Sequence, residues 1–164
     1  MKKRISPLLK LIVTSTLLVL VVGCNSQNEH VETIETFLKK EFTGPTDELT
    51  VAFEEDGAFP PELKEYVEEN YKPLVMSWED MLNANHLLLY QRMAYENGYQ
   101  LKPANIELKK DQDLAYDYKV KVEYSKDGKS KTATVTGRIN LNDEGKIVTI
   151  RNLDDGGLLD SLKQ

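Results

Sequence analysis

Apolar residues recur at helical spacing through the first half of the chain. Val31, Ile34, Leu38 and Phe42 lie three or four positions apart, which predicts an amphipathic helix that Thr43-Gly44-Pro45 ends. Caps and prolines predict three more short helices: one from Thr46 or Asp47 to Asp56-Gly57, one between Pro60-Pro61 and Pro73, and one that starts at Ser77. Residues 86–95 fit either a helix or a strand, and we interpret part of this segment as a strand.

The second half of the chain alternates between apolar and polar residues. The even positions from Leu114 to Tyr124 are apolar or aromatic, and Asp117, Lys119, Lys121 and Glu123 occupy odd positions between them, so one face of this strand is buried. Turns at Asp127-Gly128 and at 142–145 separate it from a Thr-rich strand and from a last strand at 147–150, and 99–110 is a strand before them. Pro103 indicates a sheet edge or a bend, and Gly137 indicates a bend or bulge in a sheet that curves.

Helices followed by an antiparallel meander predict an α+β fold in which N-terminal helices pack on a curved antiparallel β-sheet. The chain here resembles the NTF2-like, cystatin-like superfamily, and more narrowly small Gram-positive lipoproteins without an assigned activity. The segments that carry this resemblance are Phe42-Thr43-Gly44-Pro45, Tyr71-Lys72-Pro73-Leu74, Val135-Thr136-Gly137-Arg138 and Gly145-Lys146-Ile147. The resemblance implies a cone-shaped domain in which helices cover the concave face of the sheet.

The N-terminal segment has the layout of an export signal. Lys2, Lys3, Arg4 and Lys10 are followed by thirteen uncharged residues, 11–23, which is shorter than the roughly 20 residues of a membrane-spanning helix. Val21-Val22-Gly23-Cys24 resembles the lipobox of bacterial lipoproteins. That resemblance implies cleavage between Gly23 and Cys24, a diacylglyceryl group on the Cys24 sulfur and an N-acyl group on the new amino terminus. The alternative is an ordinary signal peptide in which Cys24 is inert.

The N-terminal pattern predicts three parts of the chain: a signal peptide at 1–23, a lipidated tether at 24–29 without a helix pattern, and a folded domain at 30–164. The predicted location is the extracytoplasmic face of the cell membrane, where the acyl chains on Cys24 insert into the lipid bilayer. Removing residues 1–23 takes away four basic residues and no acidic ones, so the formal net charge changes from −6 to −10. We expect anionic lipid to repel a domain with this negative charge, so the acyl groups would make the contact with the membrane.

Composition excludes several classes of function. The 164 residues include 27 Asp plus Glu against 21 Lys plus Arg, which argues against a nucleic-acid partner. A single Cys excludes an intramolecular disulfide, and with two His it makes a zinc site of the Cys/His type implausible. Acidic runs at 54–57 and 154–157 lack the alternating oxygen ligands of a calcium loop and fit a helix end and a turn. We predict no metal and no cofactor.

Candidate chemistry is limited to the concave face of the sheet. A pocket there would be lined by Trp78, His86, Tyr90, Tyr116 and Tyr118, although alternating aromatics are more typical of a filled core. His86 with Asp80 or Asp117 would make a general base and its orienting partner, against the simpler interpretation of a half-buried histidine. No catalytic motif is present, so no catalytic residue is assigned.

These observations favour a non-catalytic module of the cell envelope that binds an envelope protein or a small ligand. The alternative is a small pocket enzyme, or a binder of hydrophobic ligands, that uses the concave face of the sheet. The tail, residues 158–162, is a short amphipathic segment that we expect to dock on its own domain.

Overall fold

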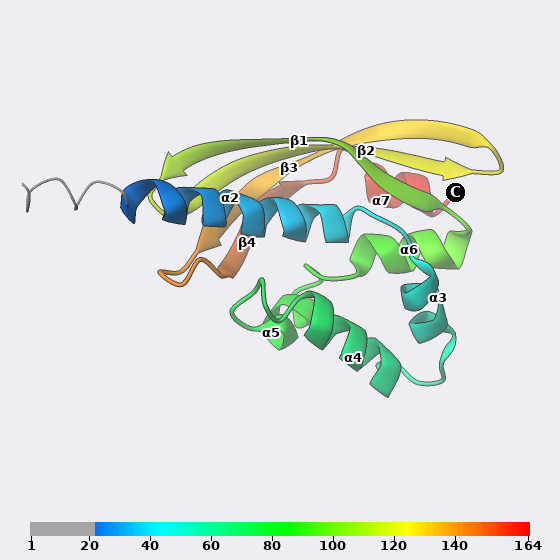
Figure 1. The fold of residues 1–164 in the computed structure, drawn as a ribbon. Helices are drawn as coiled ribbons and strands as arrows, with labels where there is room; N and C mark the ends of the chain where they lie inside the picture. Colours follow the sequence, from blue (N-terminus) through cyan, green and yellow to red (C-terminus); the bar gives the residue numbers. More distant parts are fainter. Residues whose placement is uncertain (1–21) are drawn as a thin grey trace, which may run out of the picture.

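The computed structural model describes residues 22–164, with side chains from residue 28 onward. Within these residues, five helices precede four strands and a short helix follows them (Figure 1), which confirms the predicted α+β class. The elements are α2 (Val22–Glu41), α3 (Asp47–Glu54), α4 (Pro61–Asn70), α5 (Trp78–Asn83), α6 (Leu89–Asn97), β1 (Gln100–Gln112), β2 (Ala115–Lys126), β3 (Lys129–Leu141), β4 (Ile147–Asp154) and α7 (Leu158–Leu162).

The predicted helix starts are confirmed by their caps. Thr46 caps α3 by accepting a hydrogen bond from the Leu49 N–H, Ser77 caps α5 through Asp80 N–H, and α4 starts at Pro61. The prediction of a tether without helix at 24–29 was wrong, because α2 is already helical from Val22. A helix propagates at little cost once it is nucleated, and packing of its residues after position 30 supplies the nucleus.

The segment at 86–95 is not a strand. Residues 89–97 form α6, which buries Tyr90, Gln91 and Ala94 at helical spacing. Gly98 ends the helix in a left-handed conformation and donates its N–H to the carbonyls of Ala94 and Tyr95. The run of apolar residues fits a strand as well as a helix, so its period did not distinguish them. The glycine after the run was the stronger indication of a helix.

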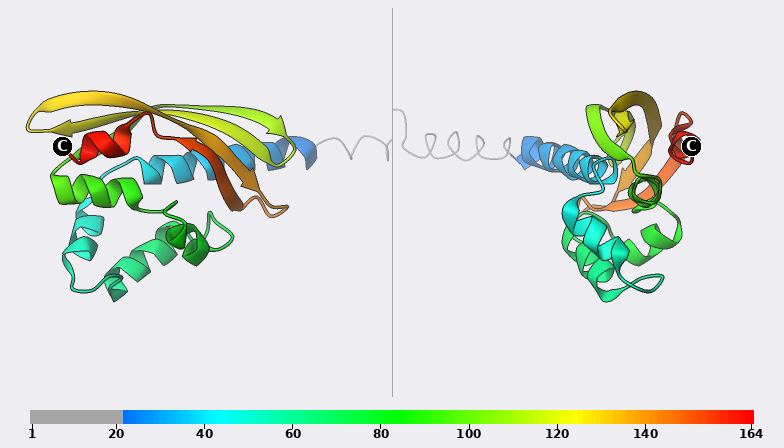
Figure 2. Two further views of the ribbon diagram at one scale, coloured as in Figure 1. Left: turned by 180° about the vertical axis from the view of Figure 1, so that it is seen from behind. Right: turned by 90° about the vertical axis from the view of Figure 1, so that its right-hand side faces the viewer.

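The sheet is an antiparallel meander in the order β1-β2-β3-β4. It arches over α2 and α6, so the helices lie on its concave side (Figures 1 and 2). The even residues of β2 from Tyr116 to Tyr124 are buried against these helices, as their alternation predicts. The N-terminal end of α2 lies at the end of the sheet with the β1–β2 and β3–β4 turns, and the tip of the β2–β3 hairpin lies at the opposite end (Figure 1).

Irregular positions in the strands lie where the sheet bends. β1 is an edge strand, and its register shifts between Pro103 and Asn105, in agreement with the expectation for Pro103. The pairing of β3 with β4 shifts between Thr136 and Arg138, on either side of Gly137. A Cβ at Gly137 would lie 2.6 Å from the hydroxyl oxygen of Tyr118, so the Tyr118 ring covers the bare backbone of its cross-strand partner.

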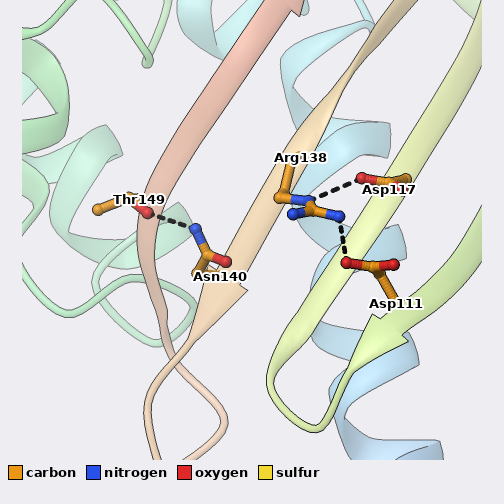
Figure 3. Close-up of polar contacts among 5 residues, drawn as sticks. All are labelled: Asp111, Asp117, Arg138, Asn140 and Thr149. Atoms are coloured by element: carbon orange, nitrogen blue, oxygen red, sulfur yellow. Dashed lines mark hydrogen bonds and ion pairs between the residues drawn. The ribbon is translucent and has the colours of Figure 1, made fainter.

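The convex face carries polar networks (Figure 3). Arg138 on β3 pairs with Asp117 on β2 at 2.8 Å and with Asp111 on β1. The guanidinium of Arg138 lowers the pKa of Asp117 below its usual value, chiefly by hydrogen bonding to it. Beside this cluster, Asn140 Nδ2 donates to Thr149 Oγ1 at 2.8 Å. These bonds join all four strands across the solvent-exposed side.

The C-terminal helix docks on its own domain, as predicted. Leu158 and Leu162 of α7 are fully buried, and α7 lies against α6 and β3. Asp155 stabilises the start of this helix, because its carboxylate accepts hydrogen bonds from the N–H groups of Gly157 and Leu159.

We expect Leu162→Ala to lower the free energy of unfolding by about 2 to 4 kcal/mol, because the truncation leaves a cavity in a well-packed layer. Val51→Ala is the matched control, since Val51 is 55 % exposed and its truncation should cost well under about 1 kcal/mol. Urea unfolding of both variants measures the difference. Equal, small losses in the two would show that α7 contributes nothing to the core.

Candidate functional site

A small apolar pocket lies on the concave side of the sheet. α2 and α6 form two of its walls, β2 and β4 form the sheet side, and the loop between α5 and α6 closes it. Its lining residues are Phe37, Leu38, Glu41, Phe42, Asn85, His86, Tyr90, Tyr118, Ile150 and Leu153. Glu41 is the one carboxylate among them.

Glu41 is buried because it continues the apolar stripe of α2. It lies three and four positions after Leu38 and Phe37, on the face that packs against the core, and its side chain is 4 % exposed. Burial raises the pKa of this carboxyl group from 4.5 to about 8. Hydrogen bonds from Tyr71 and from the backbone of Leu88 act in the opposite direction and offset part of that rise. The group is therefore a neutral acid at pH 7.

A chain of buried hydrogen bonds holds this acid in place. Gln91 Nε2 donates to the Lys40 carbonyl at 2.6 Å and to the Tyr71 hydroxyl at 3.2 Å, and Tyr71 hydrogen-bonds Glu41. The Tyr71 ring packs edge-on against Phe37, with centroids 6.1 Å apart. Gln91 Oε1 is buried and has no hydrogen-bond donor in the structure. One acceptor of this buried network is therefore left without a partner.

The loop that closes the pocket contains two residues in the left-handed region of backbone space. Asn85 has φ +56° and Leu88 has φ +64°, and left-handed conformations are uncommon for a branched apolar residue such as Leu. Leu88 is 2 % exposed, and its N–H points at Glu41 Oε1 over 3.4 Å. Strained residues of this kind occur where the surrounding structure over-determines them, often at ligand sites. Here the strain aims one backbone donor at the buried acid.

The cavity inside the pocket has a volume of about 20 Å³. That is the room for about one water molecule. Its mouth is marked by residues that reach solvent: Asn85 is exposed, Leu153 is 40 % exposed, and His86 is half-buried. Burial lowers the pKa of His86 and raises the pKa values of Tyr90 and Tyr118, so all three side chains are neutral at pH 7.

Three of the five predicted lining residues surround this cavity, namely His86, Tyr90 and Tyr118. Trp78 instead stacks on Phe59, with centroids 5.9 Å apart, and Tyr116 is a buried core residue whose hydroxyl has no partner in the structure. Sequence reasoning missed Glu41. Its place on the apolar stripe of α2, next to Phe42, was the available signal.

The alternative that pairs His86 as a base with Asp80 or Asp117 is not supported by the structure. Asp117 lies on the convex face and is paired with Arg138, and Asp80 is an exposed residue in the first turn of α5. Neither contributes to the lowered pKa of His86, which comes from burial. Alternation along β2 explains the position of Asp117, because the odd residues of this strand face away from the helices.

The acidic run at 154–157 serves as a turn. Asp154 Oδ1 accepts the Gly156 N–H at 3.0 Å, and Asp155 accepts at the start of α7. Within residues 22–164, no group of three or more His, Cys, Asp or Glu side chains is placed to hold a metal ion.

Gly23 and Cys24, the predicted cleavage and lipidation site, lie in the first turn of α2. The Cys24 side chain and residues 1–21 of the predicted signal peptide are outside the described part of the chain. No helix within the described residues is long and apolar enough to cross a membrane.

No protein-family model matches the chain, and no curated protein matches its sequence. The NMR solution structure of TraH from the Gram-positive conjugative plasmid pIP501 is similar at 13 % identity and a TM-score of 0.48, over 76 % of this chain and 91 % of that one. The NMR structure of a de novo β-sheet design protein is similar at 16 % identity and a TM-score of 0.39, over 81 % and 89 % of the two chains. Neither similarity assigns the chain to a family.

Proposed function

We propose that this protein is a lipoprotein of the cell envelope whose domain is a non-catalytic binding module. The observation that carries the proposal is the position of the single cysteine, directly after a basic segment and a thirteen-residue uncharged segment. Diacylglyceryl and N-acyl groups on Cys24 hold it on the extracytoplasmic face of the cell membrane. Two or more acyl chains are the number that gives stable membrane attachment.

The geometry of α2 supports this arrangement. Ile34, which is fully buried, lies ten positions after Cys24 in this helix, a rise of about 15 Å at 1.5 Å per residue. His30 on this stretch packs against Gly145 in the β3–β4 turn. An anchor on Cys24 therefore directs the end of the sheet with the β1–β2 and β3–β4 turns toward the bilayer, and directs the β2–β3 hairpin away from it.

The chemistry of the pocket favours binding over catalysis. Glu41 is a neutral acid among apolar and aromatic side chains, and the residues described around it include no nucleophile with an activating base. A role as a binder of ligands with an apolar part, through the concave face, fits the same pocket. Membership of the NTF2-like superfamily remains part of this proposal.

Replacing Cys24 by Ser tests the anchor. We expect the variant to lose its acyl groups and to leave the membrane fraction, because a hydroxyl does not form the thioether that the lipid requires. Fractionation of a Gram-positive host that expresses the protein, followed by mass spectrometry of the mature N-terminus, measures both effects. Gln27→Ser, three residues further along, is the control and should remain lipidated. Unchanged membrane attachment of Cys24→Ser would contradict the proposal.

A further inference from the structure

Glu41 lacks a cationic partner among the described residues. Neighbouring Lys40 directs its Nζ to Asn70 at 2.7 Å, and Lys39 pairs with Glu35 at 3.0 Å, both away from the pocket. Burying a carboxyl group without a charge partner costs folding free energy, and an apolar residue at this position would pack without that cost. The acid therefore has a use other than stability.

The walls around this acid are aromatic. Phe42 and Tyr90 lie with ring centroids 5.3 Å apart and inclined at 42°, and Phe37 and Tyr118 line the same cavity. Aromatic faces carry negative electrostatic potential and attract ammonium groups within about 6 Å of the ring centroid. A carboxylate surrounded by such faces is complementary to a cation and repels an anion.

The hydrogen-bonding groups of the site point to the same class of ligand. Leu88 N–H is 3.4 Å from Glu41 Oε1, a long distance for such a bond, and Gln91 Oε1 in the adjoining network has no donor. An ammonium group has donors and no acceptor, which matches a carboxylate whose backbone hydrogen bond is long and a neighbouring amide oxygen without a donor. The side chain of Leu153, 40 % exposed at the mouth, offers an apolar contact for whatever is attached to that group.

We propose that this pocket binds the positively charged head of a small organic amine, with the Glu41 carboxylate as its counter-ion and the rings of Phe37, Phe42, Tyr90 and Tyr118 as its walls. The cavity of about 20 Å³ accepts one group of the size of a water molecule, which an ammonium head matches. The alkyl part of the amine lies at the mouth against Ile150 and Leu153. This inference rests on the proposed binding role and names its ligand class.

Binding is coupled to loss of the Glu41 proton, because the cation pairs with the ionised carboxylate. With its pKa raised to about 8, Glu41 is mostly protonated at pH 7, so each amine bound at that pH releases most of one proton. The apparent affinity rises about tenfold per pH unit below pH 8 and levels off above it. The titratable groups that face Glu41 or its neighbours across the pocket are Tyr66, Tyr71, Tyr90, Tyr118, His86 and, through Tyr90, Asp155.

Titration calorimetry of the full chain in a non-ionic detergent tests the proposal, with n-butylammonium as the probe and n-pentanol as its neutral counterpart of similar size. Repeating the titration at pH 7 in buffers of different ionisation enthalpy measures the proton release. We expect n-butylammonium to bind and n-pentanol to bind at least about tenfold more weakly. Glu41→Gln should weaken the amine at least about 30-fold, because it removes one member of a buried charge pair. Glu32→Gln, on the exposed side of α2, is the matched control and should bind as the wild type does.

Three results would overturn this assignment. They are equal affinity for amine and alcohol, an amine affinity that Glu41→Gln leaves unchanged, and the absence of amine binding between pH 6 and pH 9. Each of them leaves the lipid anchor intact, since Cys24→Ser tests that part of the proposed function separately. If Cys24→Ser leaves the membrane fraction and the wild-type protein binds no amine, the lipid anchor is upheld and the proposed ligand class is rejected.

Discussion

Glu41→Gln should make the protein more stable at alkaline pH and should remove most of the pH dependence of its stability. The folded chain holds a proton on Glu41 up to a pKa of about 8, whereas the unfolded chain releases it near 4.5. Between these values the folded state binds more protons, so raising the pH favours unfolding. At about 1.4 kcal/mol per pH unit, the wild type should lose up to about 4 kcal/mol between pH 5 and pH 9. Gln is neutral throughout and avoids that loss.

Urea unfolding of the two proteins at pH 5, 7 and 9 measures the effect. At pH 5 the variant should lie within about 1 kcal/mol of the wild type, because both side chains are then largely neutral in the folded state. Glu32→Gln is again the control, because it makes the same chemical replacement on the exposed side of α2 without touching the pocket. Parallel pH profiles for Glu41→Gln and the wild type would show that the carboxyl group is not held neutral by burial.

Gly137→Ala should be the most disruptive small substitution in the sheet. A Cβ at this position would lie 2.6 Å from the Tyr118 hydroxyl oxygen and 2.7 Å from Cζ of the same ring. Tyr118 is 4 % exposed and is enclosed by the core, so the ring has little room to move. Overpacking of this kind costs roughly 1 to 3 kcal/mol, and the register shift at Gly137 adds to the constraint.

A double-mutant cycle with Tyr118→Leu separates this contact from a general loss of strand geometry. In the Tyr118→Leu background the added methyl group no longer meets the ring, so Gly137→Ala should cost markedly less, with a coupling energy of about 1 kcal/mol or more. Thermal unfolding of the four proteins supplies the numbers. Additive losses would place the need for glycine in the backbone of β3 and not in the Tyr118 ring.

Local patterns in the sequence were sufficient for most elements. Thr46, Ser77 and Pro61 set helix starts through their own side chains or ring, and alternation along 114–124 fixed which face of β2 is buried. The prediction of a strand within 86–95 was wrong, because a dense apolar run fits both the helical and the strand period. Packing of Tyr90, Gln91 and Ala94 decides that the segment is a helix. Gly98 indicated the end of this helix, because glycine favours the left-handed conformation of a helix C-terminus.

The sequence predicted only part of the candidate site. His86, Tyr90 and Tyr118 were expected near a pocket and do line one, but the pairing of His86 with Asp80 or Asp117 required a contact that spacing does not encode. Trp78 is aromatic, as a lining residue was expected to be, but it stacks on Phe59 and does not line the pocket. Aromatic character identifies a residue that will be buried, and only the packing of helices on the sheet decides what it is buried against.

The sequence by itself determined the α+β class, the helix caps, the buried face of β2, the irregularity of β3 at Gly137 and the chemical pattern around Cys24, because each depends on residues close together in the chain. The tertiary structure decided that Glu41 is enclosed, that Tyr71 and Gln91 hold it, and that Leu88 aims a backbone donor at it. These contacts join residues 20 to 51 positions apart. A charged residue near the end of an amphipathic helix is exposed unless a distant segment covers it, and that covering is a property of the fold.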